Sequence, residues 1–177
     1  MAEDRVTELA ERARDPIRRA AHMEPDYSVE SLAAVDHFLS QLPAAAPNAL
    51  LETAAQLGCY FGEVVRRALG GHWDTTAREP QKWRLVLSAA PLSFHPIGMA
   101  AEAIYKDEVD GYDGSLEVSD ALRPLLARAL EAMGEVDEEY YYSLTGRLET
   151  VQHVLDVLVA GIRTAQTRAV PERPRRS

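Results

Sequence analysis

The fold of this chain is decided by a helix-forming stretch, LGCYFGEV at residues 57–64, which GGHW follows at residues 70–73. Around this stretch, apolar residues recur every three or four positions, as they do on one face of a helix. Glycine inside a helix costs about 1 kcal/mol relative to alanine, so Gly58 and Gly62 predict close contact with another backbone. The glycine pair that opens GGHW predicts the end of the helix.

A β-strand is predicted shortly after this helix. Residues 83–88 alternate polar and apolar side chains between two prolines, which is typical of a half-buried strand. Residues 72–76 and 92–94 are weaker candidates for its neighbours, because one strand alone leaves its backbone groups unpaired. We therefore expect a small antiparallel sheet of two or three strands, with Trp73 and Trp83 as buried anchors.

Helical periodicity surrounds the predicted strands on both sides. The stretches with one apolar face are residues 6–21, 32–42, 50–69, 97–105, 122–133 and 140–162. Pro16 predicts that the first helix ends or bends there. The near-heptad spacing of the last stretch is typical of a core helix or of a homodimer surface.

The fold class expected from these patterns is a helix-dominated α+β single domain. The domain is expected to cover residues 1–169, with residues 1–22 as an N-terminal helical arm. Residues 170–177 are rich in arginine and proline and are expected to form a disordered basic tail.

Net charge bounds the partners of this chain. The formal charge is −9, and because residues 168–177 hold four arginines and one glutamate, residues 1–167 carry 15 basic and 27 acidic residues. An acidic body repels phosphate backbones and attracts basic surfaces. A protein partner with a basic surface is therefore expected, and nucleic acid is not.

Cysteine usage and hydropathy indicate the compartment. Cys59 is the single cysteine, so no intramolecular disulfide can form, and its place in mid-helix predicts a passive thiol. The first residues are charged, and no window approaches the roughly 18 apolar residues of a membrane span. A cytoplasmic protein away from the membrane is expected. No nucleotide-binding motif occurs, so no cofactor is expected.

The leading functional hypothesis rests on the acidic segment at residues 107–120, which holds six carboxylates and no basic residue. We expect a loop there, or two short edge strands on a loop. The hypothesis is a non-enzymatic protein-binding module, such as an adaptor or an immunity-type inhibitor of a basic effector. The residues expected to contact the partner are Asp110, Tyr112, Asp113 and Glu117.

The alternative hypothesis is a small hydrolase, in one version metal-assisted, whose site is assembled by the fold. The site would lie around GGHW and the predicted strand-to-helix junction at Pro96. Its candidate catalytic residues are Glu63, His72, His95 and Glu102. Convergence of these side chains in a concave pocket would favour the hydrolase over the binding module.

Two further sets of charged residues follow helical spacing. Glu149, His153 and Asp156 share one helical face at spacings of four and three, as metal ligands or an ordinary solvated face would. Glu102 and Lys106, four residues apart, are predicted to form an exposed ion pair.

The stretch at residues 57–64 also resembles the signature of a bacterial family of unknown function. That signature is LGxYxGEV, a GGxW shortly afterwards, then a strand and a proline-led helix. The likeness covers about residues 26–135. It implies a common fold but no activity, and no catalytic residue is carried over from it.

Overall fold

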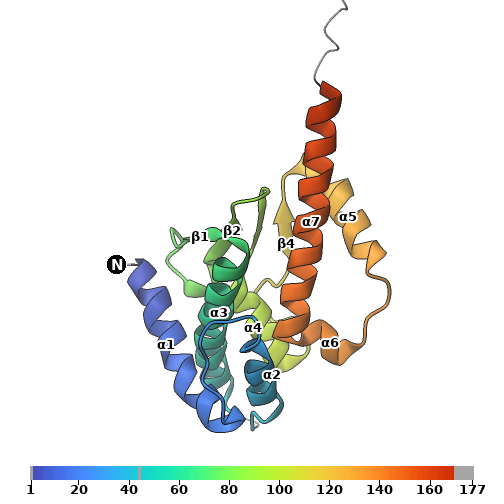
Figure 1. Cartoon of the computed structure of the whole chain (residues 1–177). Coiled ribbons are helices and arrows are strands. Elements are labelled where there is room, and N and C mark those ends of the chain that lie inside the picture. The colour runs from blue at the N-terminus through green and yellow to red at the C-terminus, as the bar shows by residue number, and fades with distance from the viewer. Residues whose placement is uncertain (1, 44, 170–177) are drawn as a thin grey trace, which may run out of the picture.

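The long helix α3 (Pro47–Leu69) packs against α1 (Ala2–Ala21) and α4 (Pro96–Tyr105) (Figure 1). The computed structural model describes residues 2–43 and 45–169, so the predicted tail at residues 170–177 lies outside the described residues. A helix-dominated α+β domain is confirmed. The remaining helices are α2 (Leu32–Ser40), α5 (Arg123–Ala132), α6 (Glu138–Tyr142) and α7 (Leu144–Ala169), with short 3-10 turns at Pro80–Lys82 and Asp120–Leu122.

The two glycines of α3 create the close contacts that the sequence predicts, although they differ in kind. A β-carbon at Gly58 would overlap the backbone of Ile97, so α3 and α4 approach there at backbone distance. A β-carbon at Gly62 would instead overlap the ring of Trp73 and crowd Pro96. One glycine therefore lets a helix approach, and the other lets an aromatic side chain lie across the helix.

The sheet has four antiparallel strands in the order β1-β2-β3-β4, where two or three were expected, and the acidic segment forms one strand instead of the loop or the two edge strands expected there. Its strands are β1 (Gly71–Asp74), β2 (Arg84–Leu87), β3 (Leu92–Phe94) and β4 (Leu116–Val118). The additional strand comes from the acidic segment and pairs Leu116 with Phe94. It is only three residues long and half-buried, so it carries almost none of the alternation by which a strand is recognised.

The two faces of the sheet differ in burial. Leu85, Leu92 and Phe94 are buried toward α3, and the Phe94 ring lies 6.2 Å from the Phe61 ring between centroids. Trp73 and Trp83 are buried as predicted, with 8% and 2% of their surfaces exposed. The alternate residues form the outer face of the sheet, which is polar except for Val86: they are His72, Asp74, Arg84, Val86, Ser93 and Glu117.

The terminal helices complete the core. In α1, the predicted stripe including Val6, Ala10 and Ile17 is buried, and the helix continues past Pro16 instead of ending there. In α7, the near-heptad seam supplies Leu148, Val151 and Leu158 to the core, while α5 and α6 pack along this helix (Figure 1). Much of the seam is thus used within the chain, and a homodimer through α7 stays a prediction.

Two further properties follow from packing. Cys59 is fully buried, and burial raises the pKa of its thiol to about 12, which fits the predicted passive thiol. Within the described residues, every helix is too short or too polar to span a lipid bilayer.

Replacing Gly58 by alanine is expected to lower the free energy of unfolding by about 1–3 kcal/mol, because the new methyl group would force α3 and α4 apart. Urea denaturation of the purified variant measures this loss. Gly161→Ala in α7 is the matched control, since its methyl group would meet only the movable end of Leu125 and would gain about 1 kcal/mol of helix propensity. Equal stability of the two variants would contradict the close-approach interpretation.

Candidate functional site

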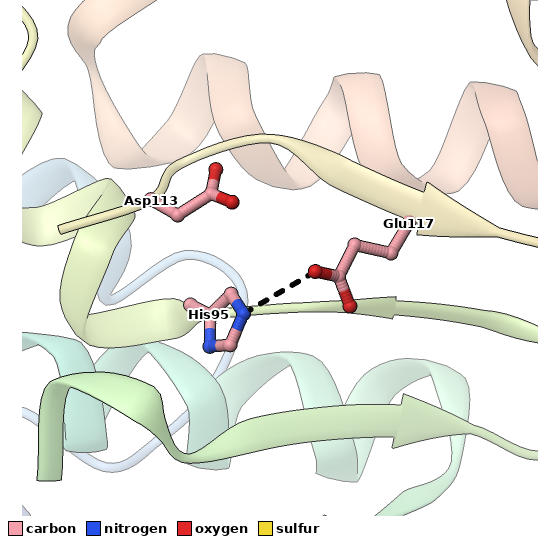
Figure 2. A group of neighbouring side chains, drawn as sticks. All are labelled: His95, Asp113 and Glu117. Carbon is pink, nitrogen blue, oxygen red and sulfur yellow. Dashed lines mark ion pairs between the residues drawn. The ribbon is translucent and has the colours of Figure 1, made fainter. Parts of the chain in front are cut away.

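Three side chains that can bind a metal ion meet on the outer face of the sheet (Figure 2). His95, Asp113 and Glu117 each offer one ligand atom, and these atoms all lie within 4.8 Å of one another. No other such group of histidine, cysteine and carboxylate side chains occurs among residues 4–43 and 45–169. We call these residues the His95 triad.

Strand register explains why residues so far apart in sequence meet. Ser93 of β3 pairs with Glu117 of β4, and both side chains lie on the outer face because side chains alternate along a strand. His95 lies two residues beyond Ser93 and therefore on the same face. It directly precedes Pro96, the first residue of α4, so its position is fixed from both sides. Asp113 comes from the loop that leads into β4.

The His95 imidazole is oriented for ligation. Its Nδ1 lies 3.2 Å from the carbonyl oxygen of Trp83, and because a carbonyl can only accept, Nδ1 must carry the proton. The lone pair of a neutral ring is then on Nε2, which lies 3.5 Å from Glu117 Oε1. A histidine that binds a metal usually donates its other ring nitrogen to a carbonyl or carboxylate in this way.

The two carboxylates of the triad are also held by neighbours. Glu117 Oε2 lies 3.4 Å from both Arg84 Nη1 and Ser93 Oγ, which leaves Oε1 toward His95. Asp113 Oδ1 accepts hydrogen bonds from the amide and the hydroxyl of Ser115. These bonds, with the nearby His95 as a smaller cause, hold the pKa of Asp113 below its ordinary value. Asp113 is therefore ionised and oriented at neutral pH.

A buried clamp holds the Asp113 loop against α4. Arg147 of α7 donates a hydrogen bond of 2.7 Å to Glu102. Arg147 also donates to the carbonyl oxygen of Gly114 at 3.2 Å, and Glu102 accepts from the amide of Gly114 at 3.1 Å. A side chain at Gly114 would overlap the Glu102 carboxylate, and one at Gly98 would overlap the carbonyl of Asp113. The loop thus fits only because both positions are glycine.

The four candidate catalytic residues do not gather in one place, although Glu63 and His72 line one hollow beside β1. Glu63 accepts hydrogen bonds from Arg66 and from the Trp73 indole; although burial opposes ionisation, these bonds keep its pKa below the ordinary value. His72 is exposed on β1. Of the four, only His95 belongs to the triad.

Glu102 has a different role from either one predicted. It is buried at 9% exposure and pairs with Arg147. The expected exposed pair with Lys106 is therefore wrong: Lys106 ends α4 in a left-handed conformation and is exposed. Local spacing could not reveal a partner 45 residues away.

The predicted partner-binding residues separate into two groups. Asp113 and Glu117 lie near His95, and Glu117 directs a carboxylate oxygen toward the ring, whereas Asp110 is exposed and Tyr112 is half-buried beside the loop. Asp113 and Glu117 therefore belong to a built site on the sheet, and Asp110 remains available to a partner.

The metal candidates on α7 have other contacts. Tyr140 donates its hydroxyl hydrogen to Glu149, and His153 Nε2 lies 3.0 Å from the carbonyl of Ala129 in α5, so it donates there. Asp156 is exposed. These side chains connect helices, or face solvent, and are not gathered around one point.

Sequence reasoning named every member of the His95 triad but assigned them to two different functions. The three residues could have been grouped if the pairing of residues 116–118 with residues 92–94 had been recognised in the sequence. This pairing places Glu117 beside Ser93 and close to His95. Three-residue strands rarely provide that signal on their own.

Comparisons with protein-family models, with curated proteins and with solved structures found no match to this chain. The resemblance of residues 57–64 to a bacterial family therefore stays a prediction.

Replacing Glu102 by alanine is expected to lower the free energy of unfolding by about 3–5 kcal/mol, because Arg147 would remain buried without its counter-charge. Thermal or urea unfolding measures this change. Glu108→Ala, at an exposed position three residues after the end of α4, is the control and should change stability by less than about 0.5 kcal/mol. Equal melting temperatures would show that the clamp does not hold the loop.

Proposed function

We propose that the protein binds a divalent transition-metal ion at the His95 triad and uses a metal-bound water for hydrolysis. The observation that carries the proposal is the orientation of the triad: three ligand atoms converge, while His95 Nδ1, Glu117 Oε2 and Asp113 Oδ1 each bond to another group. Such outer contacts fix ligands in metal sites.

The distances suit a small ion. Two ligands each about 2.1 Å from a tetrahedral Zn²⁺ lie about 3.4 Å apart, and Nε2 of His95 lies 3.5 Å from Oε1 of Glu117. The ligand atom of Asp113 lies within 4.8 Å of the other two, so it would come closer to them when an ion is bound. A ligand set of one imidazole and two carboxylates favours Zn²⁺, Fe²⁺ or Mn²⁺ over Ca²⁺, which prefers ligands that are all oxygen.

Three protein ligands leave a coordination position for water, as in catalytic zinc sites. The Glu117 side chain is 38% exposed, so a substrate can reach the ion. When bound, the metal would lower the pKa of its water to about 7 and supply a nucleophile. Arg84, which is 41% exposed and next to Glu117, would then bind a negatively charged oxygen of the substrate.

The test measures metal binding and hydrolysis together. Isothermal titration with Zn²⁺ and Mn²⁺ should give one site, and His95→Ala, Asp113→Asn and Glu117→Gln should each weaken it at least tenfold. The alanine removes a ligand, and the two amides replace a charged carboxylate oxygen with a neutral one. The metal-loaded protein should hydrolyse p-nitrophenyl acetate, and His95→Ala should abolish that activity.

Asp156→Asn and His153→Gln on α7 are the controls, since both residues lie outside the triad. They should bind metal as the parent protein does. Equal affinity in the triad variants would refute the metal site. Tight metal binding without hydrolysis would support the metal site and refute the hydrolase activity.

A second proposal, the basic protein partner, is supported by an acidic surface that the fold enlarges. Asp107, Glu108 and Asp110 are exposed, and the hollow lined by Glu108 and Asp110 is also lined by Tyr141 and Tyr142 of α6. Helix α6 begins with exposed Glu138 and Glu139. The loop and the start of α6 thus present their carboxylates on neighbouring surfaces, which favours a cationic partner.

Changing Asp107, Glu108 and Asp110 together to amides is expected to weaken binding of poly-L-lysine and to reduce its salt dependence, because these side chains supply the exposed charge. The fold should be unchanged or slightly more stable, since like charges are removed. Titration at increasing sodium chloride, followed by light scattering or calorimetry, measures the effect.

The matched control changes three exposed glutamates elsewhere, Glu30, Glu52 and Glu131, to glutamine. It alters the net charge by the same amount. If both triple variants lose affinity equally, the protein attracts cations through its overall charge and the acidic loop is not a partner surface.

A further inference from the structure

A hollow of about 360 Å³ lies between α7, α5 and the residues that lead into β4. Its apolar lining includes Met99 of α4, Leu116 of β4, Met133 after α5 and Val151 of α7. Ligand pockets in proteins are commonly of this size, and they combine an apolar lining with a few polar groups. It is separate from the His95 triad, none of whose members lines it.

Exposed apolar side chains gather around this hollow. Leu130, Val136 and Tyr141 are each exposed by more than two-fifths, and all three line it. Among the described residues, the other large apolar side chains with comparable exposure are Met23, Val29 and Tyr105, which do not line it. Three of these six exposed apolar side chains thus lie around one hollow, and such a cluster is typical of a binding site.

Arg147 also lines this hollow, and its guanidinium lies over the Tyr141 ring, 4.5 Å from the ring centroid. Its Nη1 and Nη2 bond to Gly114 and Glu102, but Nε has no hydrogen-bond partner although the side chain is only 7% exposed. No other buried side-chain nitrogen or oxygen lacks a partner in the part of the chain that the structure describes. A buried donor left unpaired costs about 1–3 kcal/mol, so an acceptor brought to it would be bound favourably.

We propose that this hollow binds a small, uncharged, mainly apolar molecule whose carbonyl oxygen accepts a hydrogen bond from Arg147 Nε. The apolar lining favours the apolar body, and the free N–H favours the acceptor. An anion is disfavoured because Glu102 already neutralises Arg147 and a second negative charge would lie beside it. The proposal is independent of metal binding at the triad.

Methionine methyl groups provide the readout. In protein labelled with ¹³C at these methyl groups, methyl butyl ketone should shift the signals of Met99 and Met133, which line the hollow, and leave Met23, which does not, unchanged. Hexane, which lacks the acceptor, and hexanoate, which is charged, should each bind at least about tenfold more weakly than the ketone.

Leu130→Lys should weaken binding of the ketone at least about tenfold by placing a charge at the mouth of the hollow. Val29→Lys is the matched control, because both residues are 42% exposed and Val29 lies elsewhere. Three results would overturn the proposal: no shift of Met99 and Met133, hexane binding as tightly as the ketone, or unchanged binding by Leu130→Lys. Shifts with the predicted order of affinities would support it.

Discussion

The rest of the structure depends on the buried ion pair between Glu102 and Arg147. Removing a charge from water costs several kcal/mol, so each of these side chains can be buried only because the other is present. The pair also joins α4 to α7, whose helices come from distant parts of the chain. Gly114 bonds to both partners, so the loop before β4 is fixed by the same interaction that joins the helices.

This constraint explains why two candidate sites lie next to each other. With Gly114 held, Asp113 on one side of it lies near His95, while Gly114 and Ser115 form part of the hollow beside Arg147. Arg147 itself uses two nitrogens for the clamp and leaves the third without a partner. A residue that stabilises the fold therefore also lines the hollow.

The acidic segment is better understood as two parts than as one surface. Asp113 and Glu117 are oriented by Ser115, Ser93 and Arg84, and such fixed geometry suits a small ion more than a variable protein surface. Asp107, Glu108 and Asp110 lie before the clamped glycine and are exposed. The metal proposal and the partner proposal therefore use different carboxylates and can be tested separately.

The sequence by itself determined the elements whose signals are local. The glycine-marked helix, the strand at residues 84–87, the two buried tryptophans and the passive thiol of Cys59 follow from periodicity and burial within short stretches. Only the tertiary structure decided that the acidic segment forms one strand paired with β3, that Glu102 pairs with Arg147, and that Asp113 and Glu117 lie near His95. The reason is physical: periodicity shows which face of an element is buried, but strand register and the approach of helices decide which distant residue lies opposite it.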